Sequence, residues 1–279
     1  MDYSFLMFPG FREKAVTLSY DDGVVADKRL VSILNQYGLK GTFNINSKRV
    51  YSERKRELHV EEVKELYLPA GHEIATHGCV HLPLAAVECA SAISDIIDDR
   101  KALENLTGEF VIGNAYANGS YDDDVVRIMR YCGICYARTV TSTHRFSMPK
   151  DWLRWNPTCK HTDPQLMELA KEFVEWKPRN YYLSNVPKLF YLWGHSYEFD
   201  DNDNWNVIEE FASYIGGKDD IWYATNGEIF LYAQAFDRLQ FSANGEFVYN
   251  PSVIDVYIRY FGNQYLIPAG KKVELKHRL

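Results

Sequence analysis

The sequence predicts an α/β barrel of parallel strands, followed by a small β appendage. Through the first part of the 279-residue chain, short apolar strands alternate with amphipathic helices. That alternation is typical of βαβ units and a parallel sheet. Six or seven units in roughly 240 residues fit a barrel better than an open sheet. After Phe241 the pattern changes, and no helix fits.

The expected barrel strands are short apolar runs, at residues 14–20, 41–45, 72–76, 110–115, 135–139, 189–193 and 221–223. The helices between them have apolar residues at helical spacing, within residues 26–37, 60–68, 83–106, 122–131, 163–174, 205–214 and 228–241. Gly38 ends the first helix, and Pro83 is typical of a first helical turn. Residues 140–162 have no regular pattern.

The chain after the last helix alternates like strands. Asn244-Gly245 is a turn signal, and strands are expected at residues 247–249, 253–258, 265–267 and 273–275. So few short strands do not fold alone. We therefore expect a barrel over residues 1–242 and an appendage over residues 243–279 that packs on it.

Composition and charge exclude several classes of protein. Hydrophobic residues make up 46% and charged residues 25%, as in a globular protein rather than a disordered one. The net charge is −7, and the only basic cluster is the short C-terminal tail, which argues against nucleic acid as a partner. No apolar stretch is long enough to cross a membrane. The 20 Tyr and 6 Trp suit sugar rings, but they equally suit an ordinary core.

The N-terminal segment and the number of cysteines both favour a cytoplasmic protein. The N-terminus has no basic segment, and its apolar stretch stops at Pro9, so we expect a cytoplasmic protein. The five cysteines are an odd number, which is not typical of a disulfide framework. Cys132 and Cys135 form a lone C-x-x-C, interpreted as two thiols at a helix-to-strand turn.

Polar residues collect directly after four of the expected strands. Asp21-Asp22-Gly23 follows the first, His77 and His81 follow the third, residues 115–119 follow the fourth, and His195 follows residues 189–193. In a parallel barrel these strand ends share one rim, where the active sites of such barrels lie.

Together these residues suggest metal-assisted hydrolysis. Two histidines and a carboxylate form a three-ligand site with an open position, as in catalytic zinc sites. A neighbouring carboxylate supplies a base and a remote histidine an acid. Taken singly, each group also fits a solvated turn, a surface histidine pair or a surface histidine beside acidic residues.

At this point the residues resemble a known family. Residues 17–23 (TLSYDDG) resemble the T-F-D-D-G motif of polysaccharide deacetylases, carbohydrate esterase family 4, and residues 76–81 (THGCVH) resemble its H-[ST]-x-x-H motif. Residues 114–119 resemble the third motif, R-x-P-x-G, in degraded form. Residues 192–195 (LWGH) stand where the last motif, leucine then histidine, belongs. The resemblance spans residues 14 to 241 and implies a distorted (β/α)7 barrel.

The resemblance also implies roles for these residues. Asp22, His77 and His81 would hold a divalent metal, zinc by preference. Asp21 would be the general base and His195 the general acid. The backbone N–H of Asn118 would help to bind the oxyanion.

The chain departs from the family pattern in its third motif. Ala115 stands where the family has an arginine that orients and tunes the base, and Ala117 stands at the motif proline. Arg138 and Arg154 are the candidate replacements, because each lies near a predicted rim segment. Cys79, between the two histidines, is not expected to bind the metal.

The irregular segment holds three further candidates. Trp152, Trp155 and His161 could line a sugar subsite at the same rim, or the segment could only cap the barrel.

The sequence thus predicts a metal-dependent hydrolase that removes acetyl groups from an acetylated sugar or oligosaccharide. The alternatives are another amide or cyclic-imide hydrolase on the same barrel, and a non-catalytic carbohydrate-binding scaffold. Neither nucleic acid nor a membrane is an expected partner.

Overall fold

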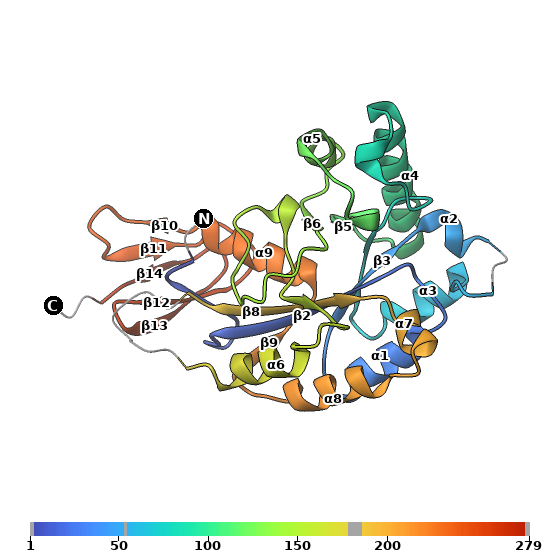
Figure 1. Ribbon diagram of the computed structural model, residues 1–279. Coiled ribbons are helices and arrows are strands. Elements are labelled where there is room, and N and C mark those ends of the chain that lie inside the picture. The colour runs from blue at the N-terminus through green and yellow to red at the C-terminus, as the bar shows by residue number, and fades with distance from the viewer. Residues whose placement is uncertain (1–2, 53–54, 178–185, 277–279) are drawn as a thin grey trace.

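The computed structural model describes residues 3–52, 55–177 and 186–276, and its main feature is a curled parallel sheet (Figure 1). The strands are paired in the order β6-β5-β4-β3-β2-β8-β7, with β9 also paired to β2. Their bounds are β2 Lys14–Asp21, β3 Gly41–Ile45, β4 Glu73–Thr76, β5 Gly113–Ala115, β6 Tyr136–Arg138, β7 Cys159–Lys160, β8 Lys188–Gly194 and β9 Ile221–Tyr223. The predicted fold class, a distorted α/β barrel, is confirmed.

One short segment joins the two sides of the curled sheet. Trp155 forms a parallel bridge with Arg138 of β6, and its N–H donates to the carbonyl of Ala137. A few residues later the N–H of Thr158 donates to the carbonyl of Tyr191 in β8. The N–H of His161 also donates to the carbonyl of Trp193 in β8, so residues 155–161 are the seam that closes the barrel.

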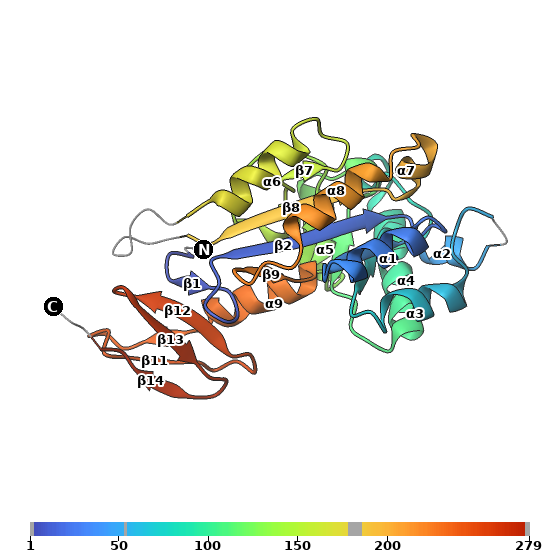
Figure 2. The ribbon, with the colours of Figure 1, turned by 90° about the horizontal axis from the view of Figure 1, so that it is seen from below.

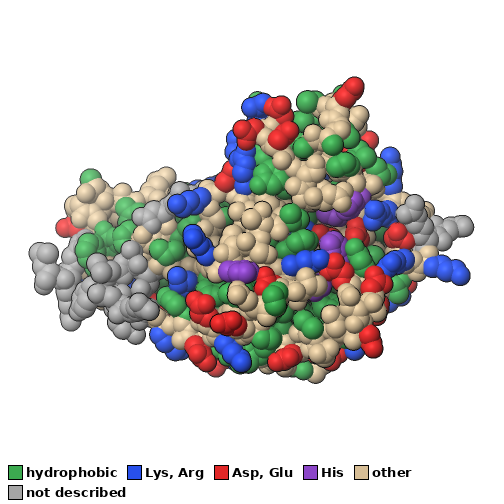
Figure 3. All heavy atoms as spheres, viewed as in Figure 1, with side chains coloured by type: hydrophobic (Ala, Val, Ile, Leu, Met, Phe, Trp, Pro, Cys, Tyr) green, Lys and Arg blue, Asp and Glu red, His purple; other side chains and the backbone are tan. Residues whose placement is uncertain are grey.

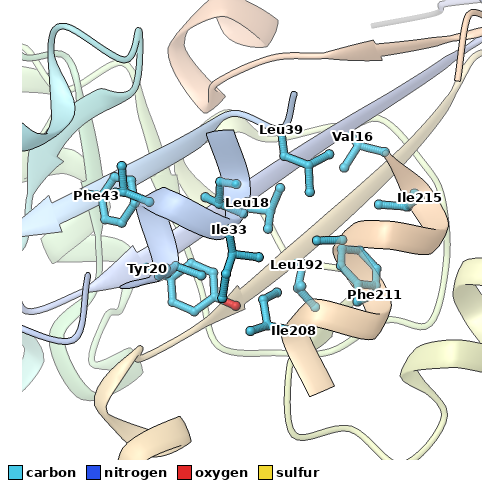
Figure 4. Packing of buried hydrophobic residues seen from close by; sticks show 14 of the residues in the cluster. Val16, Leu18, Tyr20, Ile33, Leu39, Phe43, Leu192, Ile208, Phe211 and Ile215 are labelled. Carbon is cyan, nitrogen blue, oxygen red and sulfur yellow. The ribbon is translucent and has the colours of Figure 1, made fainter. Parts of the chain in front are cut away.

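Helices α1 (Asp27–Gln36) and α8 (Asn206–Ile215) cover one face of strands β2 and β8. Figure 4 shows α1 and α8 packed on β2 and β8 through apolar side chains that include Ile33, Phe211 and Leu192, all buried. The helices of four or more residues are α1 Asp27–Gln36, α2 Ser47–Val50, α3 Val60–Tyr67, α4 Cys89–Thr107, α5 Asp123–Tyr131, α6 Leu166–Glu175, α7 Tyr197–Asp201, α8 Asn206–Ile215 and α9 Asn226–Asp237. In the described part of the chain, none is long and apolar enough to cross a membrane.

The remaining strands form two small antiparallel sheets at the end of the barrel away from α2 and α7 (Figure 2). One joins β1 (Leu6–Met7), β12 (Val256–Tyr260) and β13 (Asn263–Ile267), and the other joins β10 (Gln240–Phe241), β11 (Phe247–Tyr249) and β14 (Lys272–Glu274). The Tyr232 hydroxyl of α9 donates to the carbonyl of Met7. Because both sheets take in strands from before residue 243, the boundary at residue 242 stays a prediction.

Several element bounds differ from those predicted. The long helix begins at Cys89 rather than Pro83, because residues 84–86 form a separate 3₁₀ turn. The last helix ends at Asp237, and residues 240–241 are a strand instead. Strand β7 and the short helices α2 and α7 were not predicted, since each has too few residues to show a period.

Candidate active site

The polar residues after β2 are held in an uncommon backbone conformation. Asp21 is the last residue of β2, and the next residue, Asp22, has a φ of 83°. His81 (φ 63°) and Asn118 (φ 55°) share this left-handed conformation, which Asp, Asn and His adopt more readily than most residues. Such strain clusters at functional sites, where the surrounding structure over-determines it.

Asp22, His77 and His81 lie together as one candidate metal site. One ligand atom from each lies within 4.8 Å of those of the other two. Nδ1 of His77 lies 2.8 Å from the carbonyl of Ala115. A carbonyl only accepts, so Nδ1 carries the proton and the lone pair is on Nε2. That Nε2 is buried and has no hydrogen-bond partner in the described structure, so its lone pair is available to bind a cation.

Asp21 is buried among groups that stabilise its charged form. Asn44 donates to its Oδ1 at 2.8 Å, and Nη2 of Arg138 donates to its Oδ2 at 2.5 Å. Burial alone raises the pKa of Asp21, but the charge of Arg138, helped by His77 and His195, outweighs it and lowers that pKa. The carboxyl group is therefore ionised over the ordinary pH range.

His195 faces Asp21 from the end of β8. Its Nε2 lies 3.8 Å from Oδ2 of Asp21, and its Nδ1 lies 3.4 Å from Oε1 of Glu198. Burial lowers the pKa of His195, but the carboxylates of Glu198 and Asp21 outweigh burial and raise it. The imidazole is thus held in a form that can donate a proton near neutral pH.

Glu198 is itself fixed by two residues of the barrel seam. Lys160 donates to its Oε1 at 2.6 Å, and Nε2 of His161 lies 3.0 Å from its Oε2. Burial raises the pKa of Glu198, but these contacts and His195 outweigh it and lower that pKa. Glu198 therefore stays negative beside His195.

Asn118 stands at the open side of the same site. Its side-chain Nδ2 lies 3.4 Å from Nδ1 of His81, and the residue is exposed. It lines a cavity of about 460 Å³ that Asp21, Asp22, His77, His81 and His195 also border. The other lining residues are Val24, Arg49, Arg56, Glu57, Tyr116, Val140, Trp193 and Tyr197. Figure 3 shows His side chains (purple) in this hollow, with Lys and Arg (blue) beside them.

The structure corrects the expected sugar subsite. Trp152, Trp155 and His161 are 6%, 1% and 1% exposed, so none offers a free ring to a sugar. The two indoles pack edge to face inside the core. His161 is pressed against Gly194, where any Cβ would lie 1.9 Å from its Nδ1. Of the two alternatives, the segment closes the barrel.

The two candidate arginines, Arg138 and Arg154, lie in different environments. Arg138 is fully buried against Asp21, with its guanidinium carbon 4.3 Å from the centre of the Trp193 ring. Arg154 instead pairs with Asp123 and Asp151 on the surface. Of the two, Arg138 alone contacts Asp21.

Sequence reasoning missed three residues that hold the site. Asn44 is the register partner of Asp21 on β3, and a polar residue near the end of an apolar strand was the available signal. Arg49 donates to Oδ1 of Asp22 at 2.9 Å. Asp99, whose pKa burial raises to about 7, accepts the backbone N–H of His77 at 3.1 Å. No local pattern marks Arg49 or Asp99.

Comparison with known proteins agrees with the motifs. Residues 9–137 match the family model described as polysaccharide deacetylase, so the predicted resemblance is confirmed. The Bacillus subtilis protein YxkH, which bears a polysaccharide deacetylase name, is 25% identical over 122 residues. That match covers 43% of this chain and 43% of YxkH, less than half the length of the relative.

Solved structures share the fold. One is a Mycobacterium smegmatis protein whose name is polysaccharide deacetylase. It has a TM-score of 0.61 and 16% sequence identity, and the match covers 84% of this chain and 94% of that protein. The family 4 carbohydrate esterase from Streptomyces lividans, solved with acetate, has a TM-score of 0.52 at 14% identity, over 76% and 93%. At these identities the likeness concerns the fold.

Proposed function

Because residues 9–137 match the polysaccharide deacetylase family, we propose that this protein is a metal-dependent hydrolase that removes acetyl groups from an acetylated carbohydrate. The observation that carries the proposal is the convergence of Asp21, Asp22, His77, His81 and His195 on one cavity. A base, an acid and three ligand atoms are the parts that hydrolysis of an unactivated acetyl group needs.

The ligand set suits a divalent metal, zinc by preference. Two imidazole nitrogens and one carboxylate oxygen, from Asp22, His77 and His81, are the donor types of three-ligand catalytic zinc sites. When bound, such an ion polarises a carbonyl oxygen and lowers the pKa of water.

The residues of the chain then divide the proton transfers. Asp21 accepts a proton from the water that attacks the acetyl carbon. The backbone N–H of Asn118 donates to the developing oxyanion. His195 gives a proton to the leaving nitrogen or oxygen as its bond to the acetyl carbon breaks. Acetate and a free amine or hydroxyl leave, and solvent returns the proton from Asp21 to His195.

Arg138 bears on the main alternative. The absence of the motif arginine at Ala115 suggested a binding scaffold without activity. The contact between Arg138 and Asp21 supplies the missing charge, and so supports a working base. Another amide or cyclic-imide hydrolase uses the same groups and is separated only by its substrate.

The test is a screen for acetate release from N- and O-acetylated oligosaccharides, with a cyclic imide as a parallel substrate. We expect acetate from the wild type after zinc is added, and a fall of about 10²- to 10⁴-fold in Asp21→Asn. Stoichiometric zinc with no acetate but with imide opening would favour the enzymatic alternative. Saccharide binding without zinc or turnover would favour the scaffold.

A further inference from the structure

We propose that the saccharide substrate carries an anionic group, a carboxylate or a phosphate ester, which binds in a second groove beside the candidate active site. The proposal rests on the proposed function, because it names the class of acetylated saccharide that the site would take.

The second groove continues the first. It has a volume of about 480 Å³, similar to that of the active-site cavity, and each volume lies in the range of small-molecule sites. Val24, Arg56 and Tyr197 line both hollows, so they form a shared wall. A ligand with its acetyl group at His195 and more than one sugar unit would pass along this wall into the second groove.

Cations dominate the lining of the second groove. Lys28, Arg29, Lys55 and Arg56 line it against a single acid, Asp200. Oδ1 of Asp200 accepts the indole N–H of Trp205 at 2.8 Å, which partly satisfies that acid. The chain as a whole has a net charge of −7, so four cations around one hollow run against its general charge.

The acidic partners of these cations hold them weakly. Each described ion pair joins two exposed side chains, between 41% and 58% exposed: Lys28–Glu62, Arg29–Glu209 and Arg56–Asp201. Pairs of this kind contribute little, because water screens both charges. Lys55 lines the same hollow. An incoming anion can therefore exchange with these partners at low cost.

Aromatic rings fix two of the cations in place. The guanidinium carbon of Arg56 lies 4.6 Å from the centre of the Tyr197 ring, and that of Arg29 lies 4.5 Å from the centre of the Trp205 ring. Stacking of this kind attracts the cation to the ring face and limits the freedom that binding would cost. Val25, 40% exposed, adds an apolar surface to the same hollow.

The combination fits a charged sugar better than a neutral one. An apolar surface can take the C–H face of a ring, while arginine and lysine take a carboxylate or phosphate at its edge. A neutral saccharide would contact the apolar surface, but the lysine and arginine side chains would stay paired with their acidic neighbours.

The experiment measures binding of saccharides without acetyl groups, by calorimetry at low salt. The probes are an oligouronide, a neutral oligosaccharide of the same length, and that neutral oligosaccharide bearing one phosphate ester. We expect a charged probe to bind the wild type more tightly than the neutral one, and its advantage to shrink as salt rises. The tighter of the two charged probes identifies the anion.

The variant is the double substitution Arg29→Gln with Lys55→Gln. It should weaken binding of the preferred charged probe about 3- to 30-fold, and reduce its advantage over the neutral probe. The matched control is Lys101→Gln with Arg127→Gln, an exposed lysine and arginine that each pair with a nearby acid on α4 or α5. The control should keep the wild-type preference.

Equal affinity of the wild type for charged and neutral probes would overturn the inference, as would equal losses in the variant and the control. Because no probe carries an acetyl group, these results do not depend on turnover. A protein that prefers the charged probe but releases no acetate would overturn the proposed function and leave the groove assignment standing.

Discussion

Ala115 and Arg138 are register partners on the neighbouring parallel strands β5 and β6. Arg138 thus lies directly across the strand pair from Ala115, the position where the resemblance implies an arginine. From there Arg138 reaches Oδ2 of Asp21 at 2.5 Å. In our proposal it supplies the charge beside Asp21, although it lies 23 positions further along the chain than Ala115.

Substitution of Arg138 by Gln should raise the pKa of Asp21, because the nearest positive charge is lost. Since the base must be ionised, the acid side of the kcat/KM profile should move to higher pH, and activity should fall about tenfold or more. Arg138→Lys should restore part of the shift. Arg154→Gln, which leaves Asp21 untouched, is the control, and an equal shift in it would contradict the assignment.

Glu198→Gln should change the alkaline side of the kcat/KM pH profile. The carboxylate stabilises the protonated form of His195, so its removal should lower the pKa of that imidazole. Because the acid works in its protonated form, activity should be lost at a lower pH than in the wild type. The exposed Glu172→Gln on α6 should leave the alkaline side in place. An unmoved profile in Glu198→Gln would make Glu198 merely structural.

Metal content separates the proposed ligands from their neighbour. His77→Ala and His81→Ala should each lose most bound zinc, because each removes one of three protein ligands. Cys79→Ser should keep it, since the buried thiol donates to the carbonyl of Asp95 and is not among the three ligand atoms that lie together. Elemental analysis of the purified variants measures this. Zinc retained in both histidine variants would place the metal elsewhere.

Asp27 should make stability depend on pH. Its carboxyl group is buried, accepts the hydroxyls of Ser196 and Tyr67, and has a pKa that burial raises to about 7. The folded state therefore holds this proton up to a higher pH than the unfolded state. The stability that the proton confers is lost as pH rises from about 4 to 7, at no more than about 1.4 kcal/mol per pH unit.

Urea unfolding at pH 5, 6, 7 and 8 checks this expectation. The stability advantage of the wild type over Asp27→Asn should shrink as pH rises, because the amide does not ionise. The exposed Asp98→Asn should show a constant difference from the wild type. A constant difference for Asp27→Asn as well would show that Asp27 ionises equally in both states.

The parts of the site that lie close together in sequence were the predictable ones. Asp21 and Asp22 are adjacent, and His77 and His81 are four positions apart, so short motifs brought them together. The parallel barrel followed from the alternation of strands and helices, which needs no side-chain detail. The choice between Arg138 and Arg154 did not, because it depends on the register of β6 against β5.

The prediction of a sugar subsite in the aromatic segment was wrong for a related reason. Trp152, Trp155 and His161 have no period, and large flat side chains suit a sugar surface and a core equally. What decides between them is the short bridge from Trp155 to Arg138, a contact between segments that local sequence does not encode.

The barrel seam described above joins two tasks in one short piece of chain. Trp155 and Thr158 tie the edges of the sheet together, while Lys160 and His161 hold the carboxylate behind His195. A transient opening of the seam would separate the two sheet edges and, at the same time, release Glu198 and the neighbouring His195. The helices outside could remain folded throughout. We therefore expect a local opening of the seam to abolish activity before the whole protein unfolds.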